Sequence, residues 1–257
     1  MRAQLLDLSK WNVGFAPAHI NAQSGALVDG VILRSSYGLM PDRSFSSLYQ
    51  ASLEIPVRGA YHYLSSGSPW EQQAQFFLDL LRGKDIHFFV LDVESAFNHK
   101  SAGFALAAQR WLEYVAGRVN RKVLLYTNPY TYNTWLSPYG DWMGNYELWV
   151  AQYPYRLWND YLLKVPTDVD IQPLLPKGRD DWRMWQYSAD GNTQGSRFGV
   201  ASRDVDLNVF NGSVAELHAW AQLDKDIPDP QTQPPDFSPV LDDMQQVIDK
   251  HRQEVPA

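Results

Sequence analysis

The sequence contains no cysteine among its 257 residues. The fold therefore uses no disulfide bond, and cysteine nucleophiles and thiolate metal sites are excluded. No apolar run approaches the roughly 20 residues that a membrane-spanning helix needs, so we expect no membrane insertion. A basic excess is also missing: the net charge is -7, which argues against nucleic acid as a partner, because phosphate binding needs a basic face.

The motifs of several enzyme classes are missing as well. There is no P-loop, no G-x-G-x-x-G after a strand, no G-x-S-x-G and no H-E-x-x-H. The six histidines show no metal-ligand spacing. We therefore expect no metal and no cofactor, with one competitor kept open: a carboxylate cluster that holds Mg²⁺ or Ca²⁺. The start of the chain shows no signal peptide.

What the chain does have is a regular series of short strand-like runs. We predict strands at residues 4–8, 31–35, 57–63, 87–92, 122–127, 147–151, 183–187 and 204–209. Apolar residues at helical spacing predict helices at 69–82 and 102–119, and a closing helix at 213–223. Eight strands with helical crossovers indicate an α/β fold, a TIM-like (β/α) barrel. The irregular stretch 154–181 favours an irregular barrel with some helices missing.

The composition changes after the predicted barrel, which we place at residues 1–223. Residues 224–238 carry four prolines among polar residues and predict an extended linker. Residues 239–257 predict a short amphipathic helix with Ser238 as its N-cap. We expect this helix to pack back onto the barrel rather than to serve a dimer, and we expect a monomer.

The apolar run that begins at His87 ends in two carboxylates, Asp92 and Glu94. Side chains alternate along a strand, so both acids share a face and Val93 takes the other. Two neighbouring acids repel each other, and where such a pair sits in a cleft it usually performs acid/base chemistry with separated pKa values. The alternative is that both acids cap the following loop or pair with arginines.

In a barrel of parallel strands, the active site lies at the carboxyl ends of the strands. Closure makes the first and eighth strands neighbours, so Asp7 and Asp206 should lie close together and converge with Asp92 and Glu94. The strand ends also supply aromatic and amide side chains that we expect to bind substrate: Tyr61, Tyr63, Tyr126, Trp149, Gln152, Trp185 and Gln186. Such rings are common in sugar sites, and glycoside hydrolysis needs one protonated acid and one carboxylate.

On these residues the chain resembles the family 25 glycoside hydrolases, the muramidases called Chalaropsis-type lysozymes. The similar segments follow the order of the family: residues 6–11 (LDLSKW), 31–38 (VILRSSYG), 59–63 (GAYHY), 92–94 (DVE), 126–127 (YT), 149–153 (WVAQY), 185–187 (WQY) and 205–208 (VDLN). Each segment is a weak signal alone, and eight in order are a strong one.

The resemblance implies a flattened barrel that hydrolyses the β-1,4 bond between N-acetylmuramic acid and N-acetylglucosamine in peptidoglycan. The enzyme would then lyse bacterial cell walls, either from outside the cell or delivered by a phage. The resemblance also implies roles. Glu94 would be the general acid/base, and Asp92 would be a nucleophile or would orient the substrate N-acetyl group. Asp7 and Asp206 would hold the sugar and tune Glu94.

Two departures and two rivals accompany this resemblance. Residues 34–37 and the insertion 155–181 differ from the family pattern, which affects the outer subsites. A chitinase-like barrel needs an Asp-x-x-Asp-x-Asp-x-Glu strand, and here the first two acids would fall on His87 and Val90. The other rival is a glycan-binding module on an inactive barrel, which would not require the full set of four acids.

Overall fold

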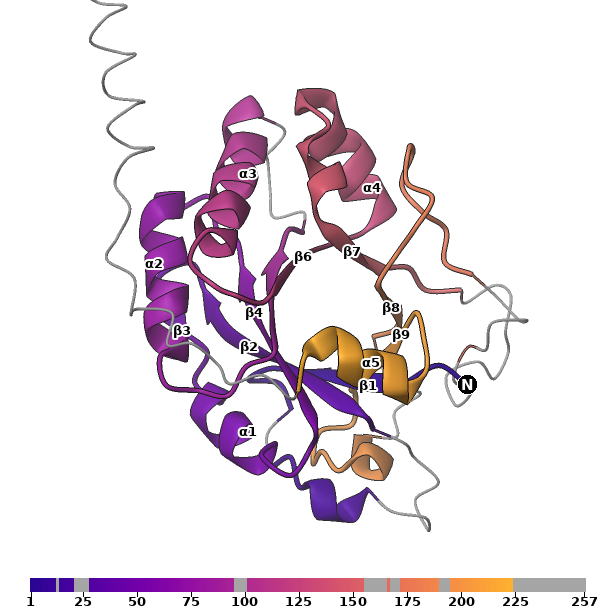
Figure 1. The fold of residues 1–257 in the computed structure, drawn as a ribbon. Helices are drawn as coiled ribbons and strands as arrows, with labels where there is room; N and C mark the ends of the chain where they lie inside the picture. The colour runs from indigo at the N-terminus through magenta and orange to yellow at the C-terminus, as the bar shows by residue number, and fades with distance from the viewer. Residues whose placement is uncertain are drawn as a thin grey trace, which may run out of the picture.

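The computed structural model describes residues 1–12, 14–20, 28–94, 101–154, 166, 172–189 and 195–223. Eight strands close into a barrel, in which β1 pairs with both β2 and β9 (Figure 1). Their bounds are β1 (Gln4–Leu8), β2 (Gly30–Tyr37), β4 (Val57–Tyr63), β5 (Phe88–Asp92), β6 (Lys122–Thr127), β7 (Glu147–Ala151), β8 (Met184–Ser188) and β9 (Asp206–Phe210). The two-residue β3 (Met40–Pro41) extends β2 as a hairpin. The predicted linker 224–238 and helix 239–257 lie outside the described residues.

The last strand runs against the others, so the expectation of an all-parallel barrel is wrong at this point. β9 is antiparallel to both of its neighbours, β1 and β8. The described part of the β8–β9 connection holds only one short 3-10 turn, η7 (Gly195–Phe198). A parallel return needs a long crossover, whereas an antiparallel one does not. The start of β9 therefore lies beside the carboxyl ends of the parallel strands, an end of the barrel that we call the mouth.

Three predicted helices are present, with slightly different ends: α2 (Trp70–Leu81), α3 (Ala102–Ala116) and α5 (Val214–Ala221). Ser101 starts α3 by accepting a hydrogen bond from the Phe104 N–H. Ser213 starts α5 with a full capping box. The remaining helices are α1 (Phe45–Ala51), α4 (Pro129–Thr131), η1 (Pro17–His19), η2 (Tyr132–Leu136), η3 (Ser137–Tyr139) and η4 (Trp142–Asn145). Among the described residues, most strand connections thus lack a long helix, and the irregular α/β barrel is confirmed.

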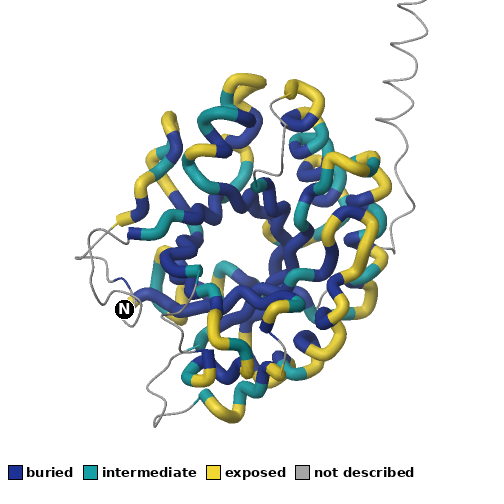
Figure 2. The backbone as a smooth tube through the Cα atoms, turned by 180° about the vertical axis from the view of Figure 1, so that it is seen from behind, coloured by how far each residue is buried: buried dark blue, intermediate teal, exposed yellow. Residues whose placement is uncertain are grey.

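The strands bury both of their faces. Side chains of β5 alternate: Phe88 and Val90 belong to the apolar cluster inside the barrel, and Phe89 and Leu91 belong to a larger cluster under the helices. Figure 2 shows the strands as a nearly continuous buried ring, with exposed residues on the helices and loops around it. Asp92 follows the inward series, so its carboxyl group points into the barrel.

The outward face of β4 holds a buried polar group. The His62 ring stacks on the Trp111 ring, 5.4 Å away between centroids, and hydrogen bonds with Ser36 Oγ (2.8 Å) and Gln73 Oε1 (3.1 Å). Burial lowers the pKa of His62 to about 4, so the ring is neutral at pH 7. His62 therefore anchors α2 and α3 to the strand, while its neighbours Tyr61 and Tyr63 take the inward face.

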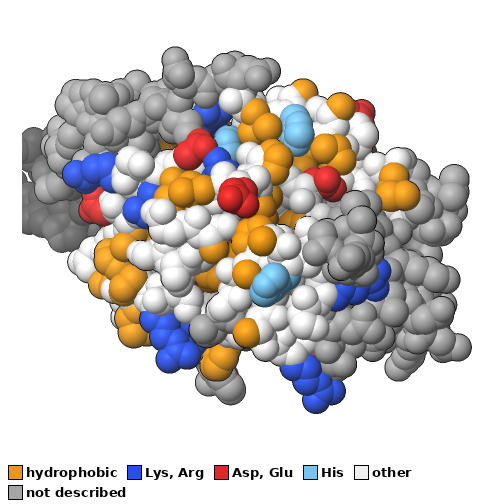
Figure 3. Space-filling view, turned by 90° about the horizontal axis from the view of Figure 1, so that it is seen from below, with side chains coloured by type: hydrophobic (Ala, Val, Ile, Leu, Met, Phe, Trp, Pro, Cys, Tyr) orange, Lys and Arg blue, Asp and Glu red, His pale blue; other side chains and the backbone are white. Residues whose placement is uncertain are grey.

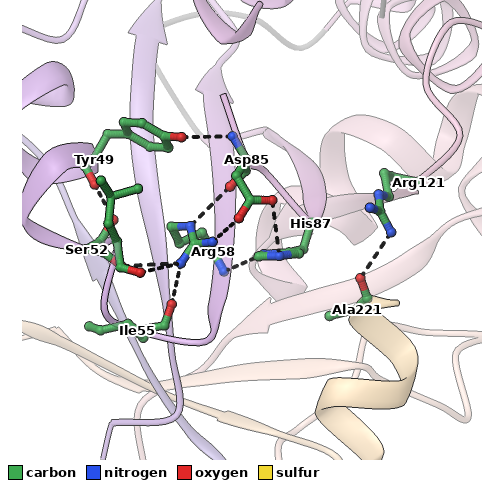
Figure 4. A network of polar contacts seen from close by, with 9 residues as sticks. Tyr49, Ser52, Ile55, Arg58, Asp85, His87, Arg121 and Ala221 are labelled. Atoms are coloured by element: carbon green, nitrogen blue, oxygen red, sulfur yellow. Dashed lines mark hydrogen bonds and ion pairs between the residues drawn. The ribbon is translucent and has the colours of Figure 1, made fainter. Parts of the chain in front are cut away.

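At the end of the barrel opposite the mouth, an ionic network surrounds Arg58 on the outward face of β4 (Figure 4). The Arg58 guanidinium pairs with the Asp85 carboxylate, and the Arg58 backbone N–H donates to His87 Nδ1 at 3.0 Å. Burial lowers the pKa of His87 to about 4, so its ring is neutral at pH 7. Because Nδ1 accepts the bond from Arg58, the single ring proton lies on Nε2, 3.4 Å from Asp85 Oδ1. Arg121 donates to the Ala221 carbonyl at the end of α5. This last bond ties the end of α5 to the residue that precedes β6.

A close approach inside the barrel makes Gly59 of β4 sensitive to substitution. A Cβ atom at Gly59 would lie 2.3 Å from the Phe88 ring, whereas one at Gly144 would meet nothing within 4 Å. We expect Gly59→Ala to lower the free energy of unfolding by about 1–3 kcal/mol, the usual cost of overpacking a core. Gly144→Ala should change it by less than about 1 kcal/mol. Urea unfolding of the two variants measures the difference, and equal effects would contradict this packing.

Candidate active site

Asp7 and Asp206 meet at the mouth, as strand closure predicts. The two residues are paired across β1 and β9. Asp7 is buried, and its Oδ2 accepts hydrogen bonds from the Asn208 amide (2.8 Å) and the Gln186 amide (2.9 Å). Burial raises the pKa of Asp7, and hydrogen bonds from Asn208, Gln186 and Asp206 partly oppose this rise. Asp7 is thus held rigidly, with little freedom to move toward a substrate.

Asp92 and Glu94 form the second acidic group of the mouth. Asp92 ends β5 and is buried, whereas Glu94, two residues later, is half-buried. Burial and then the charge of Glu94 raise the pKa of Asp92 well above its ordinary range. Burial and then the charge of Asp7 raise the pKa of Glu94. Because two such carboxyls repel each other when both are ionised, the pair holds one proton over a broad pH range.

A cation that the sequence prediction did not place among the site residues lies beside these acids. Arg34 points inward at the end of β2, and its charge lowers the pKa of Asp7, Asp92 and Glu94. Its Nε donates to Asp42 Oδ2 at 2.7 Å. The signal was available for Arg34, because it follows the inward-facing Ile32 by two positions. Asp42 carried no such signal, since it lies in the turn after β3.

The aromatic rings at the strand ends build the floor of the mouth. Trp149 is 1 % exposed and Tyr126 is 6 % exposed, so neither ring presents a face to solvent. The Trp149 indole N–H donates to Asn208 Oδ1 at 2.9 Å, and the Tyr126 hydroxyl donates to Gln186 Oε1 at 2.8 Å. Tyr61 packs edge-on against Trp149. Trp149 and Tyr126 thus orient the amides that hold Asp7, and the substrate-binding role of these three side chains stays a prediction.

Tyr153 joins the same group, although the prediction did not single it out. Its hydroxyl donates to Gln186 Oε1 at 2.6 Å, so that Gln186 accepts two bonds on one atom and donates through its other amide atom to Asp7. These accepted bonds fix which end of the Gln186 amide faces the acid. The available signal for Tyr153 was a hydroxyl group shortly after a predicted strand. The sequence does not indicate which residue would accept its hydrogen bond.

The other predicted contact residues divide between the mouth and the outer core. Tyr63 is half-buried, and burial followed by the charges of Asp92 and Glu94 raises its pKa. Gln152 is half-buried at the end of β7. Trp185 does not reach the mouth: it is fully buried in the outer cluster and donates from its indole nitrogen to the Gln152 carbonyl at 2.7 Å. Strand alternation explains this, because its neighbour Gln186 takes the inward face.

A shared cation is not indicated by the arrangement of the acids. Within the described ranges, no three acidic or histidine side chains are placed so that they could ligate one metal ion. The mouth instead combines a proton-sharing pair of carboxyls with a third, rigidly held acid. This arrangement can protonate a leaving oxygen and stabilise positive charge at the carbon that loses it.

Comparison with known proteins agrees with this chemistry. The profile of a family described as "Glycosyl hydrolases family 25" matches residues 6–196. The chain is 28 % identical over 228 residues to the uncharacterized protein YegX of Escherichia coli K12, covering 87 % of this chain and 75 % of YegX. It is also 28 % identical to lysozyme M1 of Streptomyces globisporus, over 85 % of this chain and 71 % of that protein.

Solved structures with the same fold include two bacterial proteins. A lysozyme from Streptomyces coelicolor superposes with a TM-score of 0.64 at 24 % identity, covering 86 % of this chain and 97 % of that one. A family 25 glycosyl hydrolase from Bacillus anthracis superposes with a TM-score of 0.65 at 20 % identity, covering 85 % and 93 %. The profile match spans well over half of the sequence and includes Asp7, Asp92 and Glu94. The chain therefore belongs to family 25 of the glycosyl hydrolases, a family of glycosidases.

Proposed function

We propose that this glycosidase is a lysozyme of the N-acetylmuramidase type, which cleaves the β-1,4 bond from N-acetylmuramic acid to N-acetylglucosamine in peptidoglycan. The observation that carries the proposal is the pair of Asp92 and Glu94, whose pKa values are both raised at the mouth of a family 25 barrel. Such a pair supplies a proton donor and a carboxylate at one place, as glycoside hydrolysis requires.

The roles follow from the exposure of each acid. Glu94 is the more exposed of the pair, so it delivers the proton to the glycosidic oxygen and later takes a proton from water. Asp92 lies deeper, and its Oδ1 has no hydrogen-bond partner in the described part of the chain. In the proposed reaction, this oxygen attacks the sugar carbon as nucleophile or orients the N-acetyl group. Asp7 and Asp206 hold the sugar, and the charge of Asp7 adds to burial in raising the pKa of Glu94.

The proposed partner is the glycan strand of the bacterial cell wall, reached from outside the cell or after delivery by a phage, and the protein acts as a monomer. On the face drawn in Figure 3, Lys and Arg side chains stand in separate groups rather than in one continuous band. Among the described residues, every helix is too short or too polar to cross a membrane.

The decisive experiment identifies the sugar at the newly formed chain ends. Purified peptidoglycan is digested, the new reducing ends are reduced with borohydride, and the resulting sugar alcohols are separated after acid hydrolysis. We expect muramicitol from the wild-type protein. Glucosaminitol would overturn the muramidase assignment, and no new ends at all would favour an inactive, glycan-binding barrel. Release of ends from chitin at a comparable rate would favour the chitinase-like alternative.

The alkaline limb of the pH profile should respond to Asp7. The negative charge of Asp7 raises the pKa of Glu94, second only to burial. Asp7→Asn removes this charge, so Glu94 loses its proton at lower pH, and the alkaline limb of kcat/KM should move down by about one pH unit. Asp204→Asn is the matched control, since the side chain of Asp204 is 58 % exposed and its charge is screened. An unmoved limb in Asp7→Asn would contradict the tuning role.

A further inference from the structure

The turn after β1 carries a tryptophan that is exposed although its backbone is tightly held. Trp11 is 67 % exposed, more than any other aromatic side chain of the described residues. The Ser9 N–H donates to Asn12 Oδ1 at 3.0 Å, and the Asn12 N–H donates back to the Ser9 carbonyl at 2.8 Å. The turn is therefore fixed, so the large apolar ring cannot bury itself by local rearrangement.

Contacts on both sides place this turn at the mouth. On one side, the Lys10 N–H donates to Asp42 Oδ2 at 3.0 Å, the same oxygen that accepts from Arg34 Nε. On the other side, the Asn12 amide donates to the Asp204 carbonyl at 3.2 Å, two residues before Asp206. The turn is thus hydrogen bonded to Asp42, which also pairs with Arg34, and to Asp204, just before the start of β9. It therefore lies beside the segments that carry Arg34 and Asp206.

A cation accompanies the exposed ring. The Lys10 ammonium lies 4.8 Å from the centre of the Trp11 ring, and within the described residues it forms no ion pair. The acids of the mouth repel any anionic group on a substrate, so Lys10 gives such a group a favourable place away from them. A flat ring beside an ammonium matches a sugar whose substituent carries a carboxylate.

We propose that Trp11 and Lys10 form an outer subsite that stacks one sugar ring of the glycan strand and pairs with a carboxylate borne by that strand. The inference rests on the proposed function for the choice of ligand. Peptidoglycan offers two sources of this carboxylate. One is the stem peptide, and the other is the lactyl group of those N-acetylmuramic acid residues that carry no peptide, because an attached peptide turns the lactyl carboxyl into an amide. Tyr37, which is 38 % exposed, packs at a tilt against Tyr63 with 4.9 Å between ring centroids and is not part of this subsite.

The test measures binding separately from catalysis. All variants are made in a Glu94→Gln background, and their Kd values for insoluble peptidoglycan are measured by co-sedimentation. We expect Trp11→Ala to raise Kd about ten-fold, and Trp11→Phe to recover most of the affinity. Leu106→Ala, which removes an exposed apolar side chain of α3, should leave Kd unchanged. In the background with Glu94 intact, Trp11→Ala should raise KM to a similar extent and change kcat by less than about two-fold.

The role of Lys10 is tested by changing the substrate. Lys10→Gln should raise Kd about three-fold on native peptidoglycan and should have no effect after the carboxyl groups have been amidated with carbodiimide and ammonia. An amidase removes the stem peptides and frees the lactyl carboxyl groups. On this glycan, a lost effect of Lys10→Gln assigns the carboxylate to the peptide, and an effect that persists or grows shows that Lys10 pairs with a free lactyl carboxylate. An equal effect on native and amidated material would overturn the pairing.

The two proposals fail in different ways. If Trp11→Ala binds peptidoglycan as tightly as its parent, the subsite is wrong, and cleavage by the wild-type protein still supports the muramidase function. If the wild-type protein releases no new reducing ends, the muramidase function is wrong, while a Kd raised by Trp11→Ala still supports the subsite.

Discussion

Glu94→Gln should lower kcat on peptidoglycan by about 10³-fold or more, at the upper part of the range that general acid catalysis supplies. The amide keeps the size of the side chain but cannot deliver a proton to the leaving oxygen. Glu94 is half-buried, so the substitution removes a repulsive charge without opening a cavity. The loss should therefore appear in kcat, while Kd for peptidoglycan changes little.

Two measurements separate this outcome from simple unfolding. Thermal melts should give a Tm for Glu94→Gln equal to or above that of the wild type. Glu113→Gln makes the same chemical change on the exposed face of α3, where Glu113 contacts Arg110 and Gln109 of the same helix, and should keep full activity. If Glu94→Gln retained a tenth or more of the wild-type kcat with an unchanged pH profile, another group would be the proton donor.

The strands of the barrel were predictable because their sequence signal is local. A strand that is buried on both faces reads as an apolar run, and the run that ends at Asp92 is of this kind. The predicted bounds of the first strand, 4–8, agree with β1, and the last strand, predicted at 204–209, was found at Asp206–Phe210. The meeting of Asp7 and Asp206 was predictable as well, since it depends on closure alone.

The features that were missed depend on contacts between distant segments. The direction of β9 is set by its connection, which carries no periodic signal. Either Trp185 or its neighbour Gln186 could have faced inward. The sequence does not decide between them, because both faces of β8 are buried. Asp42 became part of the site only through its bonds to Arg34 and the Lys10 backbone. Such bonds span turns and cannot be read from spacing.

Asp92→Asn should separate activity from stability. We expect kcat to fall by about 10²–10³-fold, because the carboxylate that supports the developing positive charge is lost. Stability should change in the opposite direction, since Asp92 is buried beside Glu94 and its charge is unfavourable in the folded protein. A rise in Tm of about 2–4 °C corresponds to a gain near 1 kcal/mol for a domain of this size. Asp79→Asn, an exposed substitution on α2, should change neither quantity.

The pH dependence of this gain tests its electrostatic origin. Burial and the charge of Glu94 place the folded-state pKa of Asp92 well above its ordinary value of 3.8. Ionisation of Asp92 therefore costs stability as the pH rises between the unfolded and the folded pKa. The advantage of Asn should be complete above the folded pKa, shrink as the pH falls through that window, and vanish below the unfolded value. A gain that is constant from pH 3 to pH 8 would mean that better packing, rather than relief of repulsion, stabilises the variant.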